Sequence, residues 1–227
     1  MDRRTYLRAL GGAGLGATAG CLGGGDPNTT LGKPDRRGGV TSEDLPYPAW
    51  SERIPDVTFP DPLIGERIAL REIDRPGFVT FFYTNCASVC PRLVGALREV
   101  QIHSVRNDYA DDVGFYPITF DPQRDTEKRL RAYAEEMHVD LSAGNWHFLR
   151  PESRERANSV LEEEFGFVFK RTHPEDMDTY MFTHIGLVLL VNADGYVERA
   201  YRGQEGREDR YIEDLRTVRS GGDGGLL

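Results

Sequence analysis

The sequence contains only three cysteines, Cys21, Cys86 and Cys90, among its 227 residues. Three cysteines are too few for a scaffold held together by several disulfides, so the chain has to fold around an apolar core. Long apolar runs are also missing: the mean hydropathy is −0.51, and a transmembrane helix needs roughly 20 strongly apolar residues. We therefore expect no helix that spans a membrane.

Positive charge is scarce as well. The chain has 28 Lys and Arg against 37 Asp and Glu, which gives a formal net charge of −9. Such a surface repels nucleic acid, so no nucleic-acid partner is expected. We interpret the acidity as a solvated surface that favours solubility. The length suits one domain with tails, and the 39% of hydrophobic residues suffice for one core.

The N-terminus has the features of an export signal. Arg3 and Arg4 form a twin-arginine pair, a weakly apolar stretch follows, and small residues precede Cys21. Residues 1–20 are therefore predicted to be a twin-arginine lipoprotein signal, which leaves Cys21 as the lipid-carrying first residue. The mature protein would then be extracytoplasmic and anchored to the outer face of the cell membrane. The alternative is a glycine-rich tail that stays attached.

The rest of the chain divides into three parts. Residues 21–50 are rich in Gly, Pro and polar residues without an apolar period, which predicts a flexible tether. Residues 51–220 are expected to form the folded domain. Residues 221–227 are expected to be a disordered tail.

The folded part alternates strand and helix patterns. We expect a hairpin from residues 57–59 and 66–70, strands at 78–83, 113–120, 146–149, 186–192 and 196–201, and helices at 91–107, 126–138, 152–165 and 205–219. The Asp194-Gly195 pair is typical of a hairpin turn. This order predicts an α/β, thioredoxin-like fold, with a central mixed sheet flanked by helices and a C-terminal antiparallel hairpin.

Two cysteines lie where the first buried strand is expected to meet the first helix. The spacing is Cys86-x-x-x-Cys90, followed by Pro91. If this segment is helical, positions i and i+4 lie on one face, and the two sulfurs can converge on one ion. A helix N-terminus stabilises thiolates, which are soft ligands for copper(I) or zinc. The pattern equally permits a redox pair, a structural disulfide or two buried apolar side chains.

Histidine supplies candidates for a third ligand. His184 immediately precedes the apolar strand at residues 186–192, whose start faces the cysteine loop in a thioredoxin arrangement. Pattern alone leaves open whether it is a ligand or a core histidine with its own partner. We expect the other four histidines to lie at the surface or the edge of the core.

Three segments together resemble one family, the Sco/SenC proteins, which are assembly factors for cytochrome c oxidase. They are FFYTNCASVCPRL at residues 81–93, TFDPQRDTEKRLRAYAEE at 119–136 and THIGLVLLVNADGYVERAYRG at 183–203. The resemblance spans roughly residues 57–218 in matching order and spacing, which is more specific than any one motif.

The resemblance implies a copper site. Copper, as Cu(I) or Cu(II), would be held by Cys86, Cys90 and His184 and delivered to the oxidase subunit that bears the CuA centre. The family usually has Asp before this histidine and a small hydroxyl residue after it, whereas this chain has Thr183 and Ile185. Residues around a ligand orient it and tune metal affinity, so copper binding is expected to differ from the family's norm.

The segment Asp-Pro-x-Arg-Asp-Thr contributes two acidic residues. We interpret Asp121 as part of a turn that ends the strand and Asp125 as a helix cap. A role for Asp121 beside the metal ligands or facing a partner is the alternative.

Other functions use the same residues. Cys86 and Cys90 would be the redox-active pair of a thiol–disulfide oxidoreductase that keeps a partner's cysteines reduced for metallation. A copper or redox sensor would bind without delivery. A peroxidase of this fold would need Thr84 and Arg92 beside one activated cysteine.

Overall fold

The computed structural model describes residues 26–175, 179–203 and 208–221. The strands are β1 (Thr58–Asp61), β2 (Glu66–Ala69), β3 (Gly77–Phe82), β4 (Gly114–Thr119), β5 (Phe169–Thr172), β6 (Met181–His184), β7 (Leu187–Val191) and β8 (Val197–Arg202). The α-helices are α1 (Val89–Arg106), α2 (Glu127–Glu136), α3 (Arg154–Asn158) and α4 (Glu208–Arg219).

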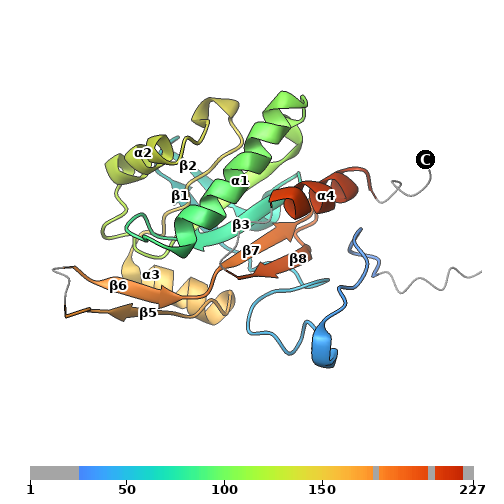
Figure 1. Ribbon diagram of the computed structural model, residues 1–227, viewed down its shortest axis with the longest axis horizontal. Helices are drawn as coiled ribbons and strands as arrows, with labels where there is room; N and C mark the ends of the chain where they lie inside the picture. Colours follow the sequence, from blue (N-terminus) through green and yellow to red (C-terminus); the bar gives the residue numbers. More distant parts are fainter. Residues whose placement is uncertain (1–25, 176–178, 204–207, 222–227) are drawn as a thin grey trace, which may run out of the picture.

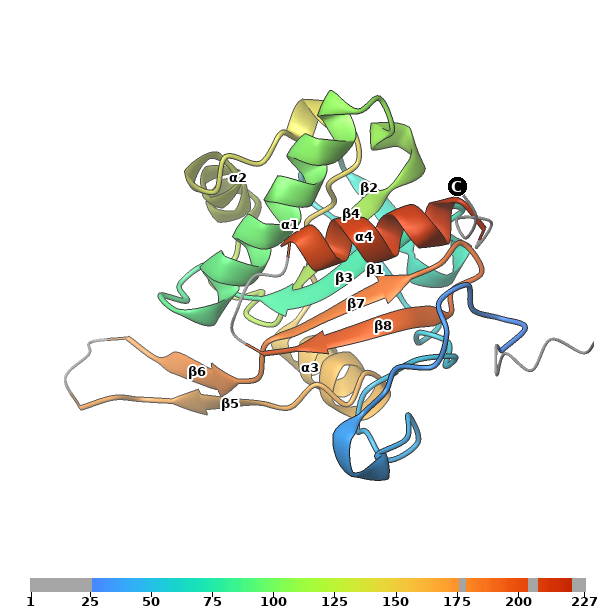
Figure 2. The ribbon, with the colours of Figure 1, turned by 45° about the vertical axis from the view of Figure 1, so that its right-hand side comes forward.

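The centre of the domain is a mixed sheet with the strand order β4-β3-β7-β8. β3 is parallel to β4 and antiparallel to β7, and β7 and β8 form the predicted antiparallel hairpin. α1 and α4 lie side by side over one face of the sheet, as Figures 1 and 2 show. The predicted α/β class with a mixed central sheet is confirmed.

The core strands are buried on both faces. Every residue of β3, β4 and β7 is buried, which explains why their sequences are continuous apolar runs rather than alternating patterns. A sheet covered in this way holds its strand ends in place, and the C-terminal end of β3 leads directly into the cysteine loop.

The helices α1, α2 and α3 differ from their predicted bounds, and the differences at α1 and α3 bear on the structure. α1 begins at Val89, so Pro91 is the third helical residue, where its missing N–H costs no intrahelical bond. The predicted helix at 152–165 is α-helical only over α3 and continues as a π-helix at Ser159–Glu164. The spacing of apolar residues could not distinguish an α-helix from a π-helix here, because Val160 and Leu161 are buried in either case.

One element was missed by the sequence analysis. β5 and β6 form an antiparallel hairpin that projects beyond the central sheet (Figure 1). Its strands have four residues each, and Lys170 and Arg171 interrupt any apolar alternation. The sequence therefore predicts no strand there.

Residues 26–50 differ from the predicted tether, because they pack against the domain as a strap. The fully buried carboxylate of Glu198 accepts hydrogen bonds from the backbone N–H groups of Thr30 at 2.9 Å and Leu31 at 2.8 Å. The Trp50 indole N–H donates to the Leu31 carbonyl at 2.7 Å. This polar segment packs against the domain because the buried Glu198 carboxylate needs hydrogen-bond donors. The pattern of apolar residues in the sequence does not reveal such a requirement.

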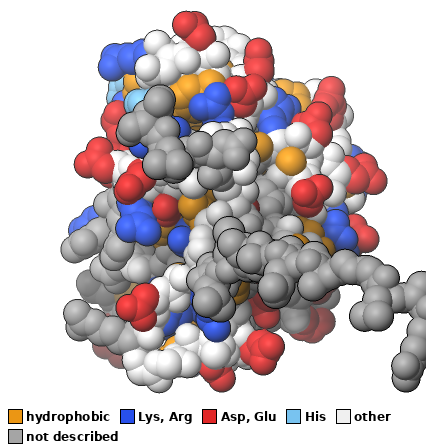
Figure 3. Space-filling view, turned by 90° about the vertical axis from the view of Figure 1, so that its right-hand side faces the viewer, with side chains coloured by type: hydrophobic (Ala, Val, Ile, Leu, Met, Phe, Trp, Pro, Cys, Tyr) orange, Lys and Arg blue, Asp and Glu red, His pale blue; other side chains and the backbone are white. Residues whose placement is uncertain are grey.

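Residues 1–25 and 222–227 lie outside the described residues, and with them the predicted export signal, Cys21 and all but the first residue of the predicted tail. Among the helices of the described residues, none combines the length and apolarity required to cross a bilayer. Acidic and basic side chains are interspersed on the face shown in Figure 3, in keeping with a solvated surface.

Candidate metal site

The cysteine loop joins β3 to α1. The Cys86 N–H donates to the Tyr83 carbonyl at 3.2 Å, which closes a turn directly after β3. Cys90 is the second residue of α1, and its N–H points at the Cys86 sulfur, 3.4 Å away. The condition for an i, i+4 pair on one helical face is not met, because Cys86 precedes the helix. The turn, rather than helical periodicity, makes the two sulfurs converge.

His184 reaches this loop from the last position of β6. Its Nε2 atom lies 3.5 Å from the Cys90 sulfur and 4.0 Å from the Cys86 sulfur. The three ligand atoms all lie within 4.8 Å of one another. The tertiary structure thus brings together the three residues for which the sequence predicts a shared metal.

The imidazole has a defined orientation. Its Nδ1 atom lies 2.9 Å from the Ile185 carbonyl oxygen, so Nδ1 donates to that acceptor and Nε2 faces the sulfurs. The rings of Phe120, Tyr83 and Phe167 surround it, with centroids 5.0, 6.0 and 6.0 Å from that of the imidazole. An imidazole oriented in this way beside two sulfurs is a preorganised metal ligand.

The two thiols differ in acidity. The pKa of Cys86 is lowered to about 3, chiefly by the hydrogen bond with Cys90 and further by His184 and by backbone N–H groups at the start of α1. Burial raises the pKa of Cys90 well above the ordinary 9.0, since its side chain is fully enclosed. Cys86 is therefore the thiolate and Cys90 the thiol in the metal-free protein.

The donor set fits a single soft ion. In a trigonal arrangement, an ion about 2.3 Å from sulfur and about 2.0 Å from nitrogen leaves these two atoms roughly 3.7 Å apart. The observed sulfur–nitrogen distances of 3.5 and 4.0 Å bracket that value. Thiolate and imidazole donors select copper(I) or zinc over hard cations.

A close backbone contact determines where the chain continues after His184. The Gly203 N–H donates to the Gly186 carbonyl at 3.1 Å. A Cβ atom on Gly186 would lie 1.8 Å from the Gly203 carbonyl oxygen, so no other residue fits at position 186 without moving the backbone. The start of β7 is thereby held against Gly203, which directly follows β8.

The other histidines lie elsewhere. His103 contacts the Tyr109 hydroxyl, His147 contacts the Asp61 carboxylate at 3.2 Å, and His138 and His173 are exposed. Within the described residues, none of these four joins a cluster of three metal-ligating side chains.

Asp125 is not the predicted helix cap, because the Thr126 side chain accepts from the Arg129 N–H and caps α2 instead. The fully buried Asp125 carboxylate accepts from the Thr84 hydroxyl at 2.6 Å and from Thr119. Burial raises its pKa from 3.8 to about 6, against the effect of these hydrogen bonds. Sequence reasoning missed this role because nothing local marks a buried carboxylate beneath a distant loop.

The same network bears on the peroxidase hypothesis. That chemistry needs Thr84 and Arg92 to face one cysteine, yet the Thr84 hydroxyl is directed to Asp125 and Arg92 is exposed. The arrangement does not favour peroxide chemistry.

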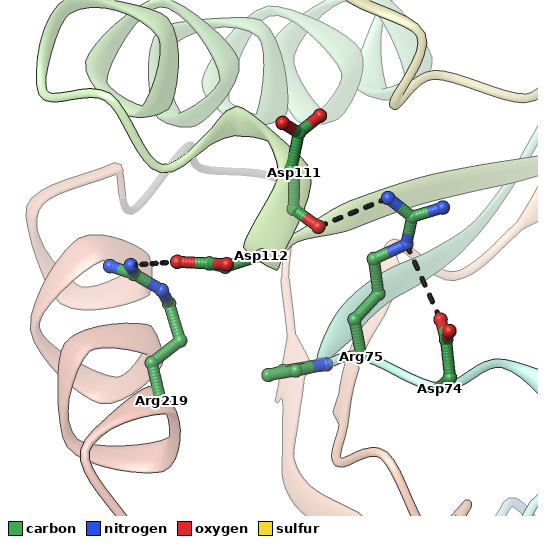
Figure 4. Close-up of a pocket in the computed structure, with 6 residues that line it drawn as sticks. Asp74, Arg75, Asp111, Asp112 and Arg219 are labelled. Atoms are coloured by element: carbon green, nitrogen blue, oxygen red, sulfur yellow. Dashed lines mark hydrogen bonds and ion pairs between the residues drawn. The ribbon is translucent and has the colours of Figure 1, made fainter.

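A surface pocket far from the cysteines offers no competing centre. Figure 4 shows Arg75 donating to the Asp111 carbonyl at 3.1 Å and pairing with Asp74, while Arg219 pairs with Asp112 at 2.5 Å. Both arginines of the pocket are paired within it, and the residues that line it include no nucleophile and no histidine.

Comparisons with known proteins agree with this arrangement. The SCO1/SenC family profile matches residues 71–220. The SCO2-like protein of Rickettsia conorii is 26% identical over 132 residues, which cover 57% of this chain. The match spans 60% of that relative's length.

Solved structures share the fold. Copper-bound ScoI of Arabidopsis thaliana superposes with a TM-score of 0.59 at 21% identity, covering 76% of this chain and 99% of that one. BsSco superposes with a TM-score of 0.58 at 21% identity, covering 77% of this chain and 96% of that one. It is described as having a disulfide switch and as a member of the Sco family of cytochrome c oxidase assembly proteins. The predicted thioredoxin-like fold is confirmed.

Proposed function

Because this chain belongs to the SCO1/SenC family, we propose that it is a copper carrier that binds one copper ion through Cys86, Cys90 and His184. The observation that carries this proposal is the convergence of two sulfurs and one imidazole nitrogen within 4.8 Å. Copper-bound ScoI of Arabidopsis thaliana, which has the same fold, supports copper over zinc.

We propose delivery to the CuA centre of cytochrome c oxidase as the purpose of the site. The support is the family itself and the description of BsSco as belonging to oxidase assembly proteins. The chemistry is ligand exchange. A thiolate of the partner adds to copper(I), then the bond to Cys86 breaks, so the copper keeps its oxidation state and is never free. Cys86 is the more accessible of the two cysteines, at 7% exposed against 0% for Cys90.

Anaerobic copper(I) titration against a competing chelator tests the ligand set. Single replacements of Cys86, Cys90 and His184 by Ala should each abolish tight one-to-one binding, because fewer than three ligands leave a weaker site. His138→Asn is the matched control, since His138 is exposed with a φ of 55° that Asn tolerates. Full binding by the His184 variant would refute the three-ligand site.

Thiol–disulfide exchange is the second candidate, because both cysteines are free and Cys86 is a thiolate. The Cys86 thiolate would attack a partner disulfide, and Cys90 would resolve the mixed disulfide, so that this chain is oxidised as the partner is reduced. His184→Ala separates the two functions: a carrier loses copper retention, whereas a reductase still transfers electrons. A copper or redox sensor would leave CuA loading unchanged when the gene is deleted under copper limitation.

We also propose that the chain is exported by its twin-arginine signal and anchored to the outer face of the cell membrane by a lipid on Cys21. The support is the order of Arg3, Arg4, the weakly apolar stretch and Cys21 in the sequence. Cys21→Ser should abolish metabolic labelling with fatty acid and release the protein from membranes, whereas Cys86→Ser should change neither.

A further inference from the structure

Three side chains fasten the end of β6 that lies farthest from the cysteines. The Asp121 carboxylate, 3% exposed, accepts a hydrogen bond from the Tyr180 hydroxyl at 2.8 Å and pairs with Arg124. Arg124 also donates to the Tyr180 carbonyl at 2.8 Å and to the Thr179 hydroxyl at 2.9 Å. We call Asp121, Arg124 and Tyr180 the latch. It joins the segment after β4 to the residue before β6.

The Tyr180 ring is held between two cations. The guanidinium carbon of Arg124 lies 3.6 Å from the ring centroid, and that of Arg171, on β5, lies 3.4 Å from it. Two guanidinium groups this close to one centroid cannot share a face of the ring, so they lie on opposite faces. Cation–π attraction on both faces fixes the ring against both the domain and the hairpin.

A row of rings connects the latch to His184. Residues 180, 182 and 184 alternate with their neighbours along the strand and therefore share one face. Tyr180 and Phe182 have centroids 5.6 Å apart, Phe182 and Phe120 5.2 Å, and Phe120 and His184 5.0 Å. A displacement at Tyr180 is thus transmitted through packed rings to the imidazole.

The hairpin depends on such side-chain contacts for its position. β5 and β6 form a separate two-stranded sheet, with no ladder to the central sheet, and two-stranded hairpins are marginal by themselves. Cys86 lies between β3 and α1, and Cys90 lies in the first turn of α1, so both belong to the domain and not to the hairpin. A movement of the hairpin therefore separates the imidazole from the two sulfurs.

We propose that the latch is a positioning device for His184, which holds the hairpin where the imidazole reaches both sulfurs. The inference rests on the proposed copper site. If the latch is weakened, the hairpin spends less time in the binding-competent position, and the apparent copper affinity falls by that fraction. Among the contacts of the described residues, Asp121, Arg124 and Tyr180 make no hydrogen bond with Cys86, Cys90 or His184, so their effect on the site is indirect.

Tyr180→Phe removes only the latch hydroxyl, and Arg124→Lys keeps the charge but loses the planar stacking and the forked donors. Tyr196→Phe, in the turn between β7 and β8, is the matched control. We expect faster amide exchange at residues 181–184 in the metal-free latch variants and about 3- to 10-fold weaker copper(I) affinity. In a His184→Ala background the latch changes should weaken binding no further, because the group they position is gone.

The outcomes separate the two proposals. The positioning role is overturned if the latch variants fold, as judged by circular dichroism, and still bind copper like the unmodified chain. This conclusion requires that His184→Ala alone weakens copper binding. An equal loss in the His184→Ala background would also overturn it. If His184→Ala binds as tightly as the unmodified chain, the proposed ligand set is wrong and the positioning role falls with it. Should Tyr180→Phe not fold, Arg124→Lys carries the same test.

Discussion

The Nδ1 atom of His184 lies 2.9 Å from the carbonyl oxygen of Ile185, the next residue in the chain. A ligand histidine usually donates its second N–H to a carboxylate or a carbonyl, which sets the tautomer. Here the main chain supplies that acceptor. The Sco/SenC pattern places Asp before this histidine, whereas Thr183 stands here with an exposed side chain. The imidazole therefore keeps its orientation even though Thr183 replaces the family's Asp.

Restoring the family's residue should bring little gain. We predict that Thr183→Asp changes copper(I) affinity by less than about threefold, because Nδ1 already has an acceptor and an exposed charge acts weakly. Competition titration measures the change, and Thr183→Asn separates the effect of charge from that of side-chain size. Tenfold tighter binding by the Asp variant alone would show that the Ile185 carbonyl is an inadequate substitute.

The acidity of Cys86 should appear in its reactivity. In the reduced, metal-free protein, iodoacetamide should alkylate Cys86 at a rate nearly independent of pH from about 5 to 8, because a pKa of about 3 keeps it a thiolate throughout. Cys90 should remain unlabelled in the folded protein. Peptide mass spectrometry reports both sites.

Cys90→Ala is the informative comparison for that experiment. It removes the hydrogen bond that contributes most to lowering the pKa of Cys86, so the labelling rate should begin to rise with pH. A rate that already rises tenfold per pH unit in the unmodified protein would contradict the low pKa.

Asp125 should make the protein less stable as pH rises. Burial raises its pKa in the fold from 3.8 to about 6, so between these values the folded state binds more protons than the unfolded state. Its contribution is complete below pH 3.8 and is lost as pH rises through about 6. Asp125→Asn removes this dependence.

Urea unfolding of both proteins measures the effect. The unfolding free energy of the unmodified protein, relative to that of Asp125→Asn, should fall by about 2 kcal/mol between about pH 4.5 and about pH 7.5. Because the two proteins share every other titrating group, their difference isolates this carboxyl. A constant difference would mean that the carboxyl is not shifted.

The strap should depend on Glu198. Glu198→Ala leaves the N–H groups of Thr30 and Leu31 without their acceptor and removes one of the two hydrogen bonds of the Asn192 amide, so we expect a loss of about 3 kcal/mol in unfolding free energy. Proteases should then cleave residues 26–50 sooner.

Copper(I) affinity should stay unchanged in this variant. Glu198 lies near the end of the sheet where β7 finishes, whereas the cysteines follow the opposite end of β3. Glu213→Ala, on the exposed face of α4, is the control. Weaker copper binding by Glu198→Ala would mean that the strap supports the site over this distance.

Local patterns predicted most of the regular structure. Buried strands such as β3 and β7 are continuous apolar runs, and the Asp194-Gly195 turn joins β7 to β8 as expected. The β5–β6 hairpin escaped prediction because its short, charged strands are stabilised by contacts with distant rings such as Phe120. Propensity says little about an element held in this way.

The sequence by itself determined the domain, the α/β class, the family and the identity of the three candidate ligands, because each leaves a trace in residue order and spacing. Only the tertiary structure decided that a turn brings Cys86 to Cys90, that the main chain orients His184, and that Asp125 and Glu198 are buried acceptors. The hydrogen-bonded partners are neighbours in the chain for His184 and Ile185 and 168 positions apart for Thr30 and Glu198. They depend on how layers and loops pack around one core, which no local pattern records.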